Sequence, residues 1–278
     1  MAGWNTLRLE VDGNVAHLHL ARPEKLNSFT QEMWGELKTL GGQLCADPGD
    51  IRALVVIGDG RAFSSGIDTS VFASDLFATP GPAGGEGGPD GSTLERMLAT
   101  ISDFQAAFTW CENAPFITIA AIRGYAFGAG LQLAIACDIR VAAEGSKLGL
   151  LELKYGILPD LGGTQRLPRL VGYGKAVELT CTTARIDAAE ALRIRLVEQV
   201  VPDADLESAA DALATAIAAQ PPLPVQGVKR AMQASYLLDR EAGLRFEAEQ
   251  QAVCIRSDDM REALAAFLEG RPAVYRGR

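Results

Sequence analysis

Histidine, aromatic side chains and positive charge are all scarce in this 278-residue sequence. It contains two His, 6% aromatic residues, and 26 Lys and Arg against 35 Asp and Glu, which leaves a net charge of −9. A general nucleic-acid binder needs cations to neutralise phosphates, so the acidic balance argues against one. An anionic small ligand is still allowed, because a few local cations and helix N-termini suffice to bind it.

The sequence also lacks paired cysteines and long apolar runs. Its five Cys are widely spread and form no Cys-x-x-Cys pair, which indicates buried or idle thiols in a reducing compartment. The longest apolar stretches, 114–122 and 124–137, are separated by Arg123 and are shorter than the ~20 residues of a membrane helix. Because the first ten residues do not resemble a signal peptide, we expect a cytoplasmic protein without a membrane span.

An alternation of apolar and polar residues predicts a β-hairpin near the start of the chain. The alternating runs are 4–11 and 14–20, and an Asp-Gly turn separates them. The second run places His17 and His19 on one face of its strand. We expect no acids beside these two side chains and therefore no metal site.

Short apolar strands then alternate with helical patterns as far as residue 201, and only helical patterns follow. Ser28 and Gln31 have the spacing of a capping box, which predicts the start of a helix. The apolar face of this helix includes Met33, Leu37 and Leu40. Later strands are predicted at 51–57, 116–122 and 197–201, and later helices at 206–219, 224–238, 241–255 and 258–269. Residues 79–91 are almost all Gly, Pro and small residues, which predicts a surface loop.

Two glycine-bearing turns, 62–68 and 124–130, each follow a predicted strand. Small residues there let a ligand approach bare backbone N–H groups, and two such groups aimed at one point form an oxyanion hole. Either turn taken alone is also typical of an ordinary strand-to-helix connection. The second turn lacks the third Gly of the dinucleotide-binding fingerprint, which argues against a Rossmann site.

An amide and two acids follow the second turn. Gln132 lies in the helical pattern just after it, Glu152 lies between leucines, and Asp160 has apolar neighbours ahead of a further helix. Burial raises the pKa of a carboxyl toward the range useful for proton transfer. For each acid alone, a helix-capping or strand-edge role is the alternative.

Four segments, taken in order, resemble the enoyl-CoA hydratase/isomerase (crotonase) superfamily from about residue 5 to 271. They are Arg22-Pro23…Leu26-Asn27, Ala62-Phe63-Ser64-Ser65-Gly66-Ile67-Asp68, Gly124-Tyr125-Ala126-Phe127-Gly128-Ala129-Gly130-Leu131-Gln132, and Gly162-Gly163-Thr164-Gln165-Arg166-Leu167-Pro168. The resemblance implies an α/β fold: a crotonase-like spiral of ββα units over 1–201, which holds a site for an acyl-CoA thioester. It implies that the C-terminal helical region, 202–278, makes trimer contacts and closes the site, in a homotrimer or a dimer of trimers. CoA is then part of the substrate, and no separate cofactor is expected.

Carried over position by position, the resemblance assigns the oxyanion donors to the backbone N–H groups of Ile67 and Ala129. It implies that Arg22 contacts a CoA phosphate and that the loop 79–91 borders the acyl pocket. The substrate-binding residues that it implies are Arg22, Lys25, Leu26, Ala62, Ser64, Ser65, Gly66, Ile67, Asp68, Tyr125 and Gly128.

The reaction depends on Gln132, Glu152 and Asp160. Hydratases of the family handle water with two glutamates, which correspond here to Gln132 and Glu152 (152 − 132 = 20). An amide cannot take up and return a proton at neutral pH. Asp160 matches the acid of family isomerases, so the resemblance favours double-bond isomerisation of an enoyl-CoA, with Asp160 and Glu152 transferring protons. The alternatives are a hydratase in which Gln132 orients water for Glu152, and an acyl-CoA-binding protein without turnover.

Overall fold

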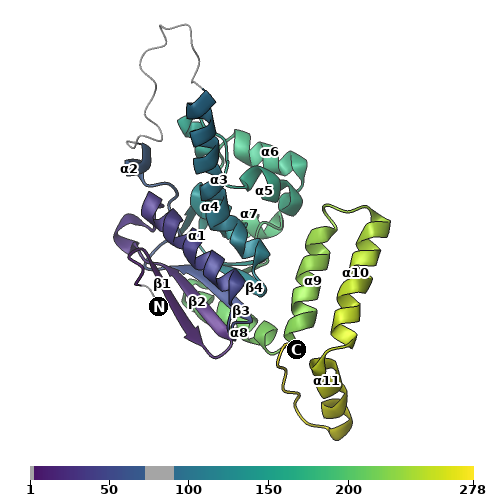
Figure 1. The fold of residues 1–278 in the computed structure, drawn as a ribbon. Helices are drawn as coiled ribbons and strands as arrows, with labels where there is room; N and C mark the ends of the chain where they lie inside the picture. Colours follow the sequence, from purple (N-terminus) through teal and green to yellow (C-terminus); the bar gives the residue numbers. More distant parts are fainter. Residues whose placement is uncertain (1–2, 73–90) are drawn as a thin grey trace, which may run out of the picture.

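Two sheets form the centre of the computed structural model, which describes residues 3–72 and 91–278 (Figure 1). In these residues, the larger sheet has the strand order β1-β2-β3-β4-β6-β9, and the smaller has the order β5-β7-β8. β1 and β2 are antiparallel, and the other neighbours in the larger sheet are parallel. The strands are β1 (Leu7–Asp12), β2 (Val15–Leu20), β3 (Ala53–Gly58), β4 (Ile117–Ile122), β5 (Tyr125–Phe127), β6 (Ile139–Ala143), β7 (Lys147–Gly149), β8 (Ile186–Asp187) and β9 (Gln199–Val201).

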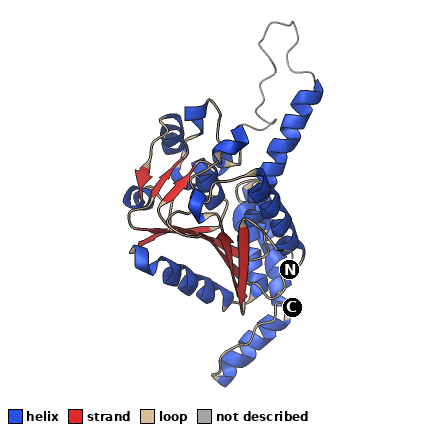
Figure 2. Ribbon diagram, turned by 90° about the vertical axis from the view of Figure 1, so that its left-hand side faces the viewer, coloured by secondary structure: helices blue, strands red, loops and turns tan. Residues whose placement is uncertain are grey.

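Helices surround the strands on several sides (Figure 2). The short 3-10 helices are η1 (Pro23–Lys25), η2 (Glu152–Tyr155) and η3 (Asp203–Asp205). The α-helices are α1 (Gln31–Ala46), α2 (Thr69–Phe72), α3 (Gly91–Asn113), α4 (Ala129–Ala134), α5 (Gly163–Val171), α6 (Tyr173–Cys181), α7 (Ala188–Arg193), α8 (Leu206–Ala218), α9 (Pro222–Ala234), α10 (Arg240–Ile255) and α11 (Asp258–Glu269).

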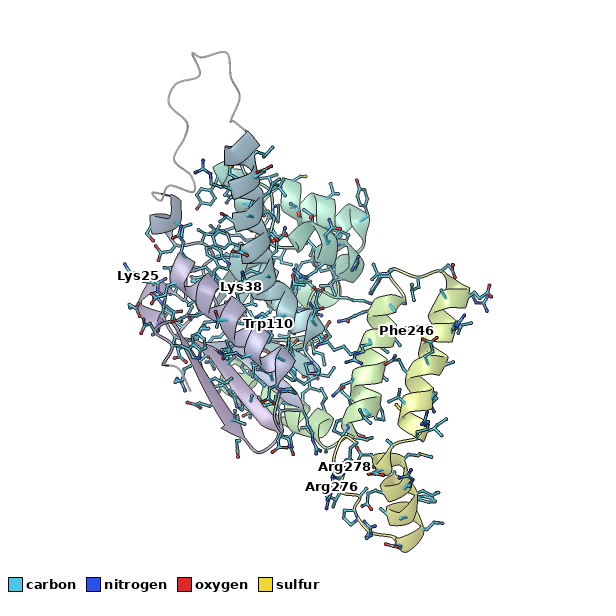
Figure 3. All side chains as sticks on the ribbon, in the orientation of Figure 1. Lys25, Lys38, Trp110, Phe246, Arg276 and Arg278 are labelled. Carbon is cyan, nitrogen blue, oxygen red and sulfur yellow. The ribbon has the colours of Figure 1, made fainter. Side chains whose placement is uncertain are left out.

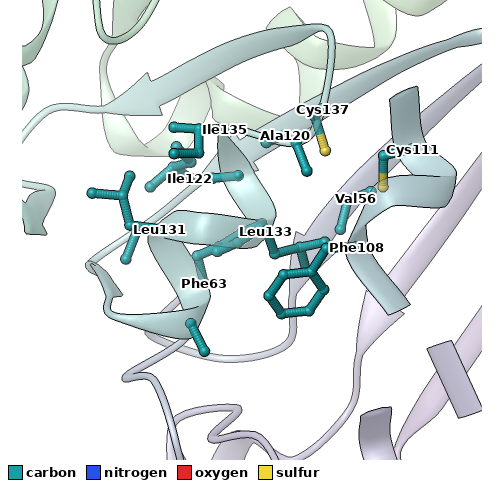
Figure 4. Close-up of a cluster of buried hydrophobic side chains, with 14 of the residues drawn as sticks. Val56, Phe63, Phe108, Cys111, Ala120, Ile122, Leu131, Leu133, Ile135 and Cys137 are labelled. Carbon is teal, nitrogen blue, oxygen red and sulfur yellow. The ribbon is translucent and has the colours of Figure 1, made fainter. Parts of the chain in front are cut away.

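β3 lies between two hydrophobic cores. Its Leu54 and Val56 belong to the core shared with α1, α3 and α4, whereas Val55 and Ile57 belong to the core that α8 covers. Because both faces are covered, every residue of β3 is buried and its sequence shows no polar alternation. Figure 4 shows Val56 in the first core, near the ring of Phe108.

The helices after β9 form two groups. α8 packs on β3, β4 and β6, whereas α9, α10 and α11 extend away from the sheets (Figure 1). α9 is anchored to the core by Lys229, whose buried Nζ donates to the main-chain oxygens of Cys111 (2.8 Å) and Phe116 (2.9 Å) and to the Asp138 carboxylate (2.8 Å). The region 202–278 therefore contains, besides η3, one α-helix that covers the larger sheet and three that project from it.

The predicted α/β class is confirmed, and the predicted strands and helices lie within a few residues of the observed ones. The start of α1 is a correction. Its N-cap is Thr30, whose side chain accepts the N–H of Met33 (3.2 Å), whereas Ser28 donates to Asp68 (2.8 Å). The cause is Phe29, which pairs in extended conformation with Ile67 and so keeps the backbone out of the helix.

The expectation that His17 and His19 have no nearby acids is wrong. His17 Nε2 lies 2.6 Å from Oδ1 of Asp211 on α8, and His19 Nδ1 lies 2.7 Å from Oδ1 of Asp59. Both acids come from other parts of the chain, so only folding brings them to the hairpin.

Residues 79–90 of the predicted surface loop lie outside the described residues, and Gly91 is the first residue of α3. Within 3–72 and 91–278, none of the helices combines the length and the apolar character needed to cross a membrane.

Candidate active site

The two glycine turns meet where Ser64 pairs with Ala126. The Ser64 amide donates to the Tyr125 carbonyl (2.8 Å), and the Phe127 amide donates to the Ser64 carbonyl (3.0 Å). The contact requires glycine at position 66, where φ is +101° and a Cβ would lie 2.9 Å from the Phe127 carbonyl oxygen. Two turns that are far apart in the sequence therefore lie side by side and form one wall of the candidate site.

The N–H groups of Ile67 and Ala129 lie at this contact. Ile67 follows Gly66 directly, and the nitrogen of Ala129, the first residue of α4, is 3.8 Å from the position of a Cβ on Gly66. Neither N–H donates a backbone hydrogen bond to any residue that the structure describes. Two such donors can stabilise an oxygen that becomes negatively charged between them.

Gln132 and Glu152 face each other beside this wall, and both are buried. Gln132 Nε2 donates to Glu152 Oε1 over 2.7 Å. The side-chain oxygen of Gln132 accepts the main-chain N–H groups of Leu161 and Gly163, each at 2.9 Å, which fixes the orientation of its amide. The structure therefore brings together two of the three predicted catalytic residues.

One oxygen of the Glu152 carboxylate accepts no hydrogen bond from the described residues. This oxygen, Oε2, is buried. The carboxylate also borders the glycine wall, since a Cβ on Gly128 would lie 3.4 Å from Glu152 Oε1. Burial raises the pKa of Glu152 above its usual range, and the negative charge of Asp160 raises it further. Glu152 therefore combines a raised pKa with an unpartnered carboxylate oxygen beside the glycine turns.

Asp160 lies half-buried on the loop between η2 and α5. Burial raises the pKa of its carboxyl. Its main-chain oxygen accepts a hydrogen bond from Gln105 Nε2 on α3 (2.7 Å). The site therefore contains two carboxyls with raised pKa values and two free N–H groups, which is a set of groups suited to moving protons next to a carbonyl.

Comparison with known proteins identifies the family. Residues 91–278 match the family model described as enoyl-CoA hydratase/isomerase. The chain is 34% identical over 275 residues to the probable enoyl-CoA hydratase echA8 of Mycobacterium tuberculosis, over 99% of this chain and 99% of that protein. It is 33% identical over 266 residues to the peroxisomal Δ(3,5)-Δ(2,4)-dienoyl-CoA isomerase of Arabidopsis thaliana, over 95% of this chain and 94% of that protein. The chain belongs to the enoyl-CoA hydratase/isomerase family.

Solved structures agree with this assignment to the enoyl-CoA hydratase/isomerase family. An enoyl-CoA hydratase from Bacillus anthracis matches with a TM-score of 0.87 and 34% identity, over 99% of this chain and 100% of that one. A Thermobifida fusca protein in complex with acetoacetyl-CoA matches with a TM-score of 0.78 and 39% identity, over 90% and 94% of the two chains. The crotonase-like fold expected from the sequence is confirmed, and the chain is an acyl-CoA enzyme of this family.

The positions predicted to bind CoA lie on neighbouring segments. The Ser65 amide donates to the Leu26 carbonyl (2.9 Å), which places the segment around Lys25 beside the first glycine turn. Ser64 is buried; its hydroxyl donates to the Asn27 carbonyl (2.8 Å). Ala62 is also buried, whereas Tyr125 is 41% exposed and stacks on Phe127. The side chains of Ala62 and Ser64 therefore pack inside the first glycine turn and stabilise its conformation.

Arg22, the predicted phosphate partner, is paired within the protein. Both of its terminal guanidinium nitrogens lie 3.1 Å from Asp68 Oδ2. Burial alone would raise the pKa of Asp68, but hydrogen bonds from Ser70, Ser28 and Arg22 lower it well below its usual range. Lys25, in contrast, is exposed at the edge of the N-terminal part (Figure 3). Lys25 is therefore the more available cation for an anionic group on a ligand.

Two polar residues that contact the site, Asn27 and Gln105, are not among the site residues predicted from the sequence. The buried Asn27 side chain donates to the carbonyls of Asp59 (2.9 Å) and Ala62 (2.8 Å), and it accepts the N–H of Arg22 (2.8 Å). Gln105 bonds the Asp160 carbonyl, as described above. Asn27 belongs to one of the four segments that resemble the family, so the sequence could have indicated its role. Gln105 lies in none of these segments.

Proposed function

We propose that this enzyme moves the double bond of an enoyl-CoA thioester. The observation that carries the proposal is the environment of Gln132, whose carbonyl accepts two main-chain N–H groups and whose amide donates to Glu152. Gln132 cannot carry a proton, so the free oxygen of Glu152 and the carboxyl of Asp160 remain as the groups that exchange protons. Isomerisation removes a proton from one carbon and delivers one to another, a task that two carboxyls can divide.

In the proposed reaction, the thioester oxygen binds between the N–H groups of Ile67 and Ala129. Glu152 removes a proton from the carbon next to the carbonyl of a 3-enoyl thioester, and the electron pair moves onto the thioester oxygen. Each N–H donor lowers the barrier by about 3 kcal/mol, because it binds the oxygen most strongly when it is anionic. Asp160 delivers a proton to the far carbon of the original double bond, and the new double bond, between the two carbons that follow the carbonyl carbon, is conjugated with the thioester. Transfer of the proton from Glu152 back to Asp160 restores the starting state.

The electrostatics of the two carboxyls support this division of roles. Burial raises the pKa of Glu152 and that of Asp160, and the charge of Asp160 raises the pKa of Glu152 further. Two interacting carboxyls of this kind hold one proton between them over a range of pH, which supplies a base and an acid together. The hydrogen bond from Gln132 lowers the pKa of Glu152 and so stabilises the ionised form that removes a proton. We infer that the acyl-CoA substrate needs no separate cofactor, because the charge on its oxygen is stabilised by backbone donors.

Hydration of an enoyl-CoA is the second candidate reaction. It is favoured by the unpartnered Oε2 of Glu152, which can accept a hydrogen bond from a water, and by the second hydrogen of Gln132 Nε2, which can orient that water. Glu152 would then have to take a proton from the water and return it alone.

Product analysis separates these reactions. The enzyme is incubated with 3-enoyl-, 3,5-dienoyl- and 2-enoyl-CoA thioesters of several chain lengths, and the products are followed by ultraviolet absorbance and mass spectrometry. We expect a conversion that conjugates the double bond without a change in mass, at least about ten-fold faster than addition of water. Hydrated product alone would contradict the isomerase proposal, and binding without any turnover would support a binding protein instead.

We also propose that the C-terminal helices make trimer contacts and close the site. Large apolar side chains are exposed on α9, α10 and α11, which extend away from the sheets (Figure 3). Examples are Met232, Leu244, Phe267 and Leu268. Exposed apolar surface of this extent is typical of an interface.

Replacing Phe267, which is 82% exposed on α11, by Glu should therefore dissociate the assembly. The mass in solution, measured by light scattering, should fall from three or six times 29.5 kDa to that of a single chain. Val11→Glu, at an exposed apolar residue of β1, serves as the control and should keep the mass. A wild-type mass of 29.5 kDa would contradict the proposal.

Lys25 is the exposed cation that we propose to contact a CoA phosphate. Lys25→Met should raise KM by about three- to ten-fold with little change in kcat, since a charge-assisted contact to a remote part of the substrate contributes to binding rather than to the chemical step. The increase should shrink as salt is added. Lys175→Met, on α6, is the matched control and should leave KM unchanged. A KM of Lys25→Met equal to that of wild type would count against the contact.

A further inference from the structure

The peptide group between Asp160 and Leu161 is held on both sides by glutamine side chains. Its carbonyl accepts a hydrogen bond from Gln105 Nε2 on α3 (2.7 Å), and its N–H donates to Gln132 Oε1 on α4 (2.9 Å). A planar peptide group that is bonded at both edges cannot rotate without losing one of the bonds. The backbone torsion at Asp160 is therefore fixed, and with it the direction in which its side chain leaves the chain.

The same series of hydrogen bonds reaches the second acid. Gln132 accepts the Leu161 N–H with its side-chain oxygen and donates to Glu152 with its side-chain nitrogen. Gln105, the Asp160–Leu161 peptide group, Gln132 and Glu152 thus form one continuous chain of contacts. The position of the Asp160 backbone relative to the Glu152 carboxylate is set by this chain.

Further residues of α3 hold the next part of the loop. Thr109 and Glu112 follow Gln105 by four and seven positions, so the three side chains share one face of the helix. Arg166 donates to Thr109 (3.1 Å), to Glu112 (2.6 Å) and to the Leu161 carbonyl (2.8 Å). Arg166 is buried, so its removal would disturb the fold; Gln105 is exposed, so its replacement removes the bond to Asp160 alone.

We propose that Gln105 is a positioning residue for proton transfer, an inference that rests on the proposed isomerase function. By binding the Asp160 carbonyl, it holds the Asp160 carboxyl within reach of the carbon that receives the proton. A displacement of about 1 Å of a reacting group can cost on the order of 100-fold in rate. Substrate binding uses other segments, so the loss should fall on kcat and not on KM.

Three variants test the inference. Gln105→Met keeps the size of the side chain but removes the donor, and it should lower kcat for isomerisation about ten-fold with KM within two-fold of wild type. Gln105→Lys restores a donor and should recover kcat to within about three-fold. Gln43→Met, at an exposed glutamine of α1, is the control and should match wild type. A wild-type kcat in Gln105→Met, or no recovery in Gln105→Lys, overturns the inference.

A double-mutant cycle separates positioning from a general structural effect. In the Asp160→Asn background, Gln105→Met should change the residual turnover less than two-fold, because the carboxyl that Gln105 positions is already gone. An equal ten-fold loss in both backgrounds overturns the inference. Full turnover of Asp160→Asn alone overturns the proposed function and the inference with it. A defective Asp160→Asn beside an unaffected Gln105→Met overturns the inference only.

Discussion

Glu152→Gln and Asp160→Asn should each lower kcat for double-bond isomerisation by at least about 100-fold, which is the usual contribution of a positioned acid or base. Both substitutions keep the size of the side chain and remove its ability to exchange protons at neutral pH. Neither change touches the N–H groups of Ile67 and Ala129, so binding of a saturated acyl-CoA should stay within a few-fold of wild type. The measurements are steady-state kinetics with a 3-enoyl-CoA and calorimetric titration with the saturated thioester.

Glu144→Gln, at an exposed glutamate in the turn after β6, is the matched control and should keep full activity. Turnover within two-fold of wild type in either Glu152→Gln or Asp160→Asn would remove the role proposed for that residue. An equal loss in the Glu144→Gln control would show that the effect is not specific to the site.

The pH dependence of Asp160→Asn gives a further check on the coupling of the two carboxyls. The negative charge of Asp160 raises the pKa of Glu152, so its removal should lower that pKa. Glu152 would then stay ionised to lower pH, and the acidic limb of the residual rate should move to lower pH. A limb that moves to higher pH would contradict the coupling.

Gly66→Ala should lower kcat by about 100-fold or more while the protein still folds. Position 66 has φ of +101°, and a Cβ would lie 2.9 Å from the Phe127 carbonyl oxygen, so the backbone must move. That movement displaces the Ile67 N–H, and the loss of one oxyanion donor typically costs 100- to 1000-fold in kcat. The strain itself costs about 1–3 kcal/mol of stability, which a domain of this size can tolerate.

Gly145→Ala supplies the control for backbone strain, because Gly145 has φ of +83° with no atoms near the position of a Cβ. Both variants should lose a few degrees of melting temperature, whereas only Gly66→Ala should lose activity. Equal activity of the two variants would mean that the Ile67 N–H does not act in the reaction.

Much of the fold could be predicted from the sequence, because its elements are set by local patterns. The alternation of the hairpin, the fully apolar run of β3 and the helical patterns after residue 201 each correspond to an observed element. The capping pattern at Ser28 predicts a start of α1 two residues too early, because the pairing of Phe29 with Ile67 is a tertiary contact that overrides this pattern. The acids beside His17 and His19 were missed for the same kind of reason, since Asp211 and Asp59 come from other elements.

The candidate site divides in a similar way. The glycine turns and the order of Gln132, Glu152 and Asp160 could be identified from the sequence, because a bare backbone N–H, a side-chain amide and a carboxyl each require a particular residue type. The partner of each group is a product of the fold: Asp68 pairs with Arg22, and Gln105 bonds the Asp160 carbonyl 55 residues away. Such contacts have no local signal, so charge and hydrogen-bond partners could not be assigned before the structure.

In the proposed reaction, two backbone N–H groups bind the thioester oxygen while two carboxyls face the reacting carbons. A crystal structure of the enzyme with a bound saturated acyl-CoA would show whether this arrangement forms. We expect the thioester oxygen about 2.7–3.1 Å from the nitrogens of both Ile67 and Ala129, with the acyl carbons next to the carboxyls of Glu152 and Asp160. A thioester oxygen remote from both nitrogens, or acyl carbons remote from both carboxyls, would contradict it.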